Sequence, residues 1–174
     1  TNQMNHKKVL LLHGWGGKKE KHWLTWLEVK LQEKNYEVYF PKIPNNYNPN
    51  LTRWLTHIDT FVKTFDPEIV IAHSLGALAW WHYQTQNNYP LAKFISVAPP
   101  TFPSFPAKMQ SFFPLPDLCN LESEHTIIYA VDDKNIEIEV LQKIEANSIE
   151  RKSGEHLDHF SGVIELQEIT TLLQ

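Results

Sequence analysis

The chain has 174 residues, with 16 lysine and arginine residues against 20 aspartate and glutamate residues and a formal net charge of -4. This length suits one domain that buries roughly 70% of its unfolded surface, so we expect a single domain over residues 1–174. The acidic balance argues against nucleic-acid binding, which depends on clustered lysine and arginine. Cys119 is the only cysteine, which excludes an intramolecular disulfide and a cysteine-built metal cluster.

The apolar runs are short. Runs such as Val9 to Leu12 and Ile69 to Ala72 fall far below the ~20 residues that cross a bilayer. We therefore expect no membrane segment, no secretory signal and a cytoplasmic location. Residues 1–3 precede Met4 and are expected to be a cloning remnant.

Short apolar segments alternate with longer amphipathic ones, which predicts strands joined by crossover helices around a mostly parallel sheet. In chain order we expect strand 8–13, helix 20–35, strand 36–40, helix 51–64, strand 68–73, helix 75–87, strand 92–98, strand 125–131, helix 136–146, strand 148–152 and helix 161–173. The predicted fold is a three-layer α/β/α sandwich with a short sheet and no separate cap domain.

Residues 99–119 interrupt this alternation. They hold six of the 11 prolines and four phenylalanines, without helical or alternating periodicity. Proline disfavours regular structure, and the phenylalanine rings need to be covered. Two interpretations remain open: a lid or pocket wall close to the active site, and a loop packed passively on the core.

Ser74 lies between a buried-looking strand and a run of small residues that opens a helix. This is typical of a nucleophile elbow, in which crowding demands small residues two positions on either side of the serine. Ala72 and Gly76 meet that demand, although Ala72 departs from the GxSxG form. The alternative is that Ser74 is only the N-cap of the helix.

A serine hydroxyl needs a base and an orienting carboxylate, expected in the order serine, acid, histidine. Asp132 and Asp133 follow strand 125–131, and His156 follows strand 148–152. Each motif alone would be interpreted as a solvated turn or a surface loop. The carboxyl ends of parallel strands share one edge, however, so these residues are expected to meet Ser74 there.

The first predicted strand ends in the glycine-rich segment HGWGG at 13–17. Backbone N–H groups stabilise the oxyanion of acyl transfer, and we expect those of Leu75 and Trp15, with Gly14 or Gly16 as alternatives to Trp15. The segment lacks the GK[ST] ending of a phosphate-binding loop.

Several motifs together resemble one family, the small serine hydrolases of the retinoblastoma-binding-protein and YdeN type within the α/β-hydrolase superfamily. The motifs are HGWGG at 13–17, HWLTWL at 22–27, AHSLG at 72–76, VAPP at 97–100, VDD at 131–133 and GEHLDHFSG at 154–162. The resemblance implies an α/β-hydrolase fold, with Asp133 as the acid and His156 as the base.

Two departures from the family leave alternatives open. Lys134 stands where proline is common, which keeps Asp132 as an alternative acid, and Glu155 stands where glycine commonly precedes the histidine. His159 is therefore an alternative base, but counting back from Gly162 and from the C-terminal helix favours His156. A metal held by His156, His159 and Asp133 would leave the serine elbow unexplained.

The sequence thus predicts a serine hydrolase with the catalytic residues Ser74, Asp133 and His156, acting on an ester, thioester or amide of a small acyl substrate. His13, Phe102 and Phe105 are expected to contact the substrate in a shallow apolar pocket. No metal or organic cofactor is expected, and nothing in the sequence points to a protein partner. The alternative function is a protein-interaction module on a hydrolase fold with little turnover.

Overall fold

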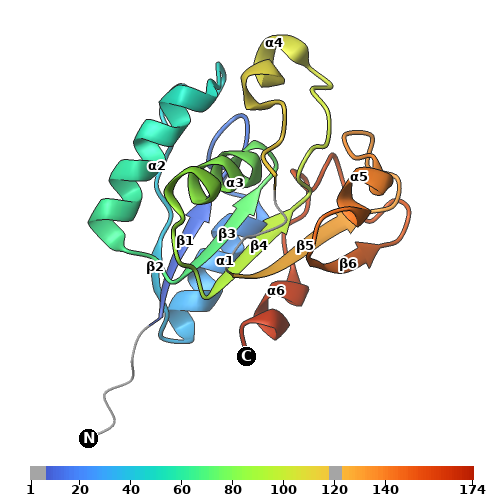
Figure 1. Cartoon of the computed structure of the whole chain (residues 1–174). Coiled ribbons are helices and arrows are strands. Elements are labelled where there is room, and N and C mark those ends of the chain that lie inside the picture. The colour runs from blue at the N-terminus through green and yellow to red at the C-terminus, as the bar shows by residue number, and fades with distance from the viewer. Residues whose placement is uncertain (1–6, 118–122) are drawn as a thin grey trace, which may run out of the picture.

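The structure is a computed structural model that describes residues 7–117 and 123–174, so residues 1–3 and Cys119 lie outside the described part. Six parallel strands form one sheet in the order β2-β1-β3-β4-β5-β6 (Figure 1). The strands are β1 (Lys8–Leu12), β2 (Glu37–Tyr39), β3 (Ile69–His73), β4 (Lys93–Val97), β5 (Glu124–Ala130) and β6 (Asn147–Arg151). The predicted parallel sheet is confirmed.

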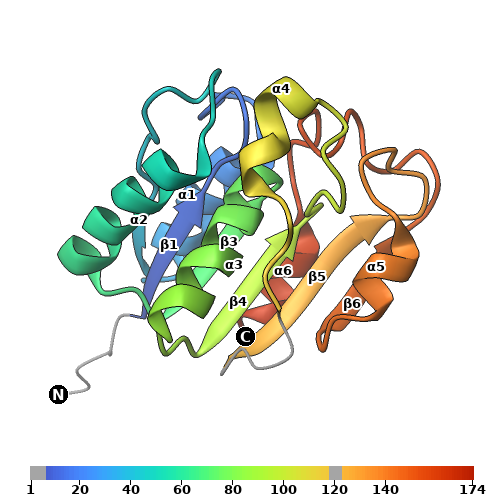
Figure 2. The ribbon, with the colours of Figure 1, turned by 45° about the horizontal axis from the view of Figure 1, so that its top comes forward.

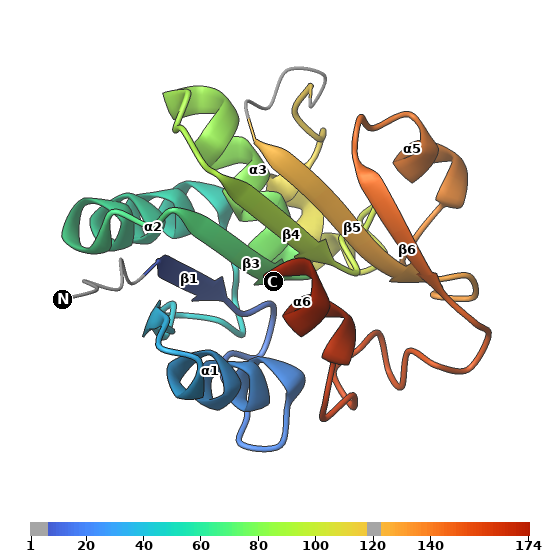
Figure 3. The same ribbon diagram turned by 90° about the horizontal axis from the view of Figure 1, so that it is seen from below.

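Helices cover both faces of the sheet. They are α1 (Trp23–Glu33), α2 (Leu51–Phe65), α3 (Leu75–Asn87), α4 (Pro106–Met109), α5 (Ile138–Gln142) and α6 (Gln167–Leu172), with a 3₁₀ turn at Gln110–Phe112. Figure 3 shows α1 and α6 on one face and α2 and α3 on the other. Each face has its own apolar core, because alternate residues of β1 and β3 point to opposite sides. The three-layer arrangement is confirmed, and the described residues form no separate cap.

Two predicted elements differ from the structure. The last helix begins at Gln167 instead of residue 161, and residues 152–166 form a long turn-rich connection. The segment that follows β4 contains α4 and a 3₁₀ turn, although its prolines suggested no regular structure. Pro106 is compatible with α4 because it occupies the first turn, where the missing N–H would have no partner within the helix.

The carboxyl ends of the strands form the edge on which α4 lies (Figure 2). The loops after β1, β3, β4, β5 and β6 all begin at this edge. Among the described helices, none combines the length and apolar character needed to cross a membrane.

Candidate active site

Ser74 occupies a sharp turn between β3 and α3. Its backbone has φ 54° and ψ -122°, a left-handed conformation that costs energy for a residue with a side chain. Gly76 is needed because a Cβ at that position would collide with the carbonyl oxygen of His13. At Gly14 a Cβ would lie 3.1 Å from the Ser74 Cβ, so the neighbouring loop also approaches closely. The local geometry is that of a nucleophile elbow.

The Ser74 side chain does not cap α3, which argues against the N-cap interpretation. Its Oγ instead lies 2.9 Å from Nε2 of His159. The other ring nitrogen of His159, Nδ1, lies 2.5 Å from Oδ2 of Asp133. Because a carboxylate only accepts, Nδ1 carries the proton and Nε2 accepts from the serine.

Asp133 is held firmly and is almost completely buried. Its Oδ1 accepts hydrogen bonds from the backbone N–H of Asn135 at 3.0 Å and from Nδ2 of Asn135 at 3.2 Å. Burial by itself raises the pKa of the Asp133 carboxyl, but the hydrogen bonds and charge of His159, together with Asn135, outweigh it and lower the pKa below its ordinary value. Asp133 is therefore a carboxylate that orients His159.

The expectation that His156 contacts Ser74 is wrong. Nε2 of His156 lies 3.4 Å from Oδ1 of Asp132, in a second histidine–carboxylate pair outside the serine chain. Asp132 also accepts from the Ser153 hydroxyl at 2.8 Å and from the Gly154 N–H at 3.0 Å. Asp132 and His156 thus brace the connection after β6, and Asp132 does not contact His159.

An unusual backbone turn brings His159 to the serine. Four consecutive residues other than glycine, Leu157 to Phe160, have φ between 31° and 67°. Phe160 N–H donates to the His156 carbonyl, and Gly162 N–H donates to that of Leu157 at 2.8 Å. The segment is a tight turn whose backbone lies in the left-handed φ region, which costs about 1–2 kcal/mol per residue. The choice of His156 by its spacing from Gly162 is wrong because the spacing gives no sign of the turn at Leu157–Phe160.

His73 supports this turn from beneath. Its Nε2 donates to the carbonyl of His159 at 2.9 Å, and its ring packs 5.1 Å from that of His22 and 5.7 Å from that of Trp23. Burial holds the pKa of His73 well below its ordinary value, so the ring stays neutral. The position of His73 directly before Ser74 is the sequence signal that could have pointed to this role.

His13 supports the glycine-rich loop in a similar way. Its Nδ1 donates to the Gly14 carbonyl at 2.8 Å, and its Nε2 accepts from the Ile43 N–H at 2.8 Å. His13 does not line the cavity above Ser74, and its expected contact with substrate stays a prediction. Trp15 and Leu75 do line that cavity.

A cavity of about 440 Å³ opens directly above Ser74 and His159. Of the two phenylalanines expected to contact substrate, Phe105 lines the cavity and Phe102 does not. The other lining residues are Trp15, Lys19, His73, Leu75, Lys108, Met109, Asn135, Asp158 and Ser161.

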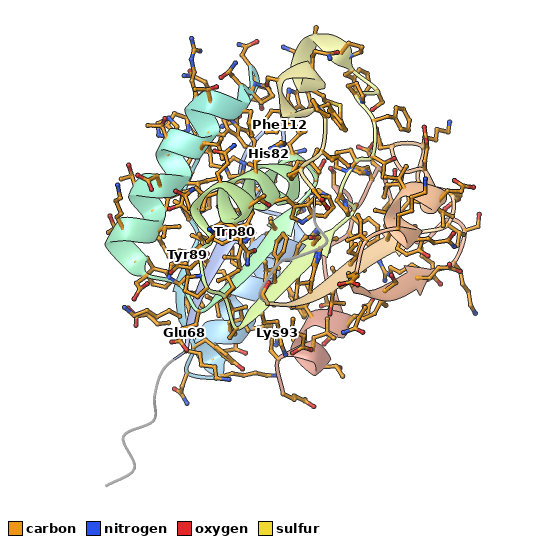
Figure 4. All side chains as sticks on the ribbon, viewed as in Figure 1. Glu68, Trp80, His82, Tyr89, Lys93 and Phe112 are labelled. Atoms are coloured by element: carbon orange, nitrogen blue, oxygen red, sulfur yellow. The ribbon has the colours of Figure 1, made fainter. Side chains whose placement is uncertain are left out.

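The proline-rich segment forms one wall of this cavity through α4. It is anchored by Phe112, which is fully buried and whose carbonyl accepts from Nε2 of His82 at 2.9 Å (Figure 4). The segment also contacts the loop after β5 that carries Asp133, because the Ser104 hydroxyl donates a hydrogen bond to Oδ1 of Asn135. For residues 99–117, the pocket-wall interpretation is therefore favoured.

The histidines and aspartates at this edge are also candidate metal ligands. Within residues 7–117 and 123–174, no group of three or more histidine, cysteine, aspartate or glutamate residues is placed to hold a metal ion. His156 and His159 instead pair with different aspartates.

Comparison with known proteins identifies the family. A family model described as serine hydrolase matches residues 9–174. YdeN of Bacillus subtilis (strain 168), named as a hydrolase, is 30% identical over 74 residues, which is 42% of this chain and 39% of that protein. The matched part of the chain thus spans about two-fifths of that relative's length.

Solved structures share the fold. The structure of the B. subtilis ydeN gene product superposes with a TM-score of 0.81 at 22% identity, over 96% of each chain. A carboxylesterase structure from Nitrososphaera gargenis superposes with a TM-score of 0.70 at 12% identity, over 97% of this chain and 89% of the other. Both likenesses are of the α/β-hydrolase fold. With the family match over nearly the whole chain, this protein belongs to the serine hydrolase family.

Proposed function

We propose that this enzyme cleaves a carboxylic ester of a small acyl substrate, with Ser74 as nucleophile, His159 as general base and Asp133 as the orienting acid. The observation that carries the proposal is the continuous hydrogen-bonded chain from Asp133 through His159 to the Ser74 hydroxyl. It replaces the sequence-based choice of His156 as the base.

The geometry supports a two-step acyl transfer. His159 Nε2 takes the proton as Ser74 Oγ attacks the carbonyl carbon, and it returns that proton to the leaving alcohol when the tetrahedral intermediate collapses. Water then attacks the acyl-enzyme by the same route and releases the acid and free Ser74. Asp133 keeps the proton on Nδ1 before the attack and stabilises the imidazolium that forms.

The proposed oxyanion donors are the backbone N–H groups of Leu75 and Trp15. Leu75 begins α3, where the first N–H groups have no acceptor within the helix. Trp15 belongs to the loop that Gly14 brings against the elbow, and both residues line the cavity. Such donors are typically worth 10²–10³-fold in turnover each.

The cavity limits the substrate class. A volume of about 440 Å³ lies within the range of small-molecule sites. An ester is favoured over a peptide, because a cavity of this size does not provide an extended binding cleft. After esters, we expect thioesters and then amides to be cleaved.

A fluorophosphonate probe tests the assignment. The probe should label the wild-type protein, and Ser74→Ala and His159→Ala should abolish or strongly slow labelling, while His156→Ala labels like wild type. A panel of acyl esters of increasing chain length then defines the substrate range. A folded wild-type protein that is neither labelled nor active on any ester would refute the proposal and favour the interaction-module alternative.

A further inference from the structure

Four lysines border the active-site cavity and its adjoining loops, although the chain as a whole is acidic. Lys19 and Lys108 line the cavity itself, Lys18 lines the neighbouring hollow beside His13, and Lys42 lies on the next loop. In the described part of the chain, no carboxylate oxygen lies within 4.0 Å of any of these four ammonium groups. Lysines elsewhere, such as Lys63, do form ion pairs.

Lys108 is fixed in place without being neutralised. Its Nζ donates to the Tyr47 carbonyl at 2.8 Å and to Oδ1 of Asn48 at 3.0 Å, and both acceptors are uncharged. An ammonium group has three N–H donors, so these two bonds leave one for a ligand. Lys108 therefore presents a positioned positive charge on the α4 wall.

Lys19 lies two residues after the glycine-rich loop at 13–17. Its Nζ lies beside Gly16, 3.9 Å from where a Cβ on that residue would be. After burial, which is the main cause, the charge of Lys19 contributes to the low pKa of His22 and of His73. The positive potential of Lys19 thus reaches the floor of the active site.

The rest of the lining is mostly apolar near the scissile position. Trp15, Leu75, Phe105 and Met109 supply apolar surface around Ser74. Among the described residues that line the cavity, Asp158 is the one with an acidic side chain, so the two lysines leave a net positive charge there. A ligand complementary to this lining combines an apolar segment with a negative charge.

We propose that the natural ester is anionic: a carboxylate or phosphate group, separated from the scissile carbonyl by a short apolar segment, binds Lys19 and Lys108. The inference rests on the proposed ester hydrolysis at Ser74. The anion can lie on the acyl side or on the alcohol side of the ester, and two chromogenic esters distinguish these sources.

The test compares specificity constants within matched pairs. On the acyl side, mono(4-nitrophenyl) adipate is compared with its neutral methyl ester; on the alcohol side, 3-carboxy-4-nitrophenyl butyrate is compared with 4-nitrophenyl butyrate. At low ionic strength, the anionic member of at least one pair should have a kcat/KM about three- to tenfold higher. Near 1 M salt, where the Debye length falls to about 3 Å, the preference should shrink.

Substitutions locate the charge responsible. The ratio of kcat/KM for the anionic ester to that for its neutral partner should fall to about one in Lys19→Gln/Lys108→Gln, which removes both positive charges. The same ratio should rise in Asp158→Asn, which removes a negative charge. Lys21→Gln is the matched control: it removes the same charge two residues from Lys19, outside the cavity lining, and should retain the wild-type preference. Equal rates within both pairs, or a preference that survives the double substitution, would overturn the inference.

Failure of the proposed function gives a different result. If no ester is cleaved and the fluorophosphonate probe does not label Ser74, the hydrolase assignment fails. Calorimetric binding of monomethyl adipate and of dimethyl adipate to Ser74→Ala then measures the anion preference without turnover. Tighter binding of the monoanion, weakened by Lys19→Gln/Lys108→Gln, would support the anion site by itself, and equal affinities would refute it.

Discussion

Two adjacent aspartates each hold a histidine, yet the two pairs differ in everything that matters for chemistry. Asp133 is buried, meets His159 at 2.5 Å, and continues through that ring to Ser74. Asp132 is exposed, and its Oδ1 lies 3.4 Å from His156 Nε2. Its other oxygen, Oδ2, accepts hydrogen bonds from the Ser153 hydroxyl and the Gly154 N–H. Similar residue types therefore belong to the proposed catalytic chain in one case and to a loop brace in the other.

The difference arises from where the chain points each side chain after β5. The Asp133 side chain enters the interior, where Asn135 and His159 satisfy both oxygens, while that of Asp132 turns toward the connection after β6. The loop brace still matters to the inner pair, because it helps to hold the strained turn that carries His159. We expect the two pairs to have unequal effects on turnover, because only the His159 pair contacts Ser74.

The largest contrast is expected between the histidines. His159→Ala should lower kcat/KM on a 4-nitrophenyl ester by about 10³-fold or more, because it removes the group that takes the serine proton. His156→Ala should stay within about threefold of wild type. Steady-state kinetics on both variants measures the contrast, with circular dichroism as a folding control. A large loss only in His156→Ala would reverse the assignment.

The aspartates should follow the same pattern on a comparable scale. Asp133→Asn should lower kcat by about 10³- to 10⁴-fold, because an amide favours the wrong tautomer of His159. Asp132→Asn should change kcat only a few-fold, by loosening the Ser153 turn. The same ester assay compares the two variants, and equal losses would show that the acid is not specific to Asp133.

A third variant tests the support beneath the inner pair. His73→Phe keeps a buried ring but removes the donor to the His159 carbonyl. We expect kcat to fall about 10- to 100-fold with little change in KM, because a displaced base loses alignment while the cavity remains. His73→Gln, which restores an N–H donor, should recover part of the loss. A change in melting temperature with unaltered kcat would indicate a purely structural role.

The smallest expected effect concerns acid stability. The pKa of Asp133 is lowered in the folded protein, so its carboxylate stabilises the fold above its ordinary pKa, and this contribution is lost as the pH falls through the lower folded value. The difference in unfolding free energy between wild type and Asp133→Asn should therefore narrow from pH 7 toward pH 3. Urea unfolding measures it, and a gap that widens on acidification would contradict the assigned sign.

The fold and much of the site could be predicted from local patterns. All six predicted strands are present, and the four inner ones are short apolar runs because both faces of this parallel sheet are covered. The elbow was visible because crowding around Ser74 demands small residues at fixed positions, as Gly76 illustrates. Asp133 was selected over Asp132 by resemblance, and the geometry brings it to His159.

The sequence by itself determined the sheet edge where the functional residues gather and the serine that lies on it. Only the tertiary structure decided which histidine reaches that serine. Local propensity disfavours four successive left-handed residues, so nothing in the spacing predicts the turn at 157–160. The turn exists because His73 beneath it and the Asp132 brace beside it hold the backbone there, and those contacts form only after distant strands have come together.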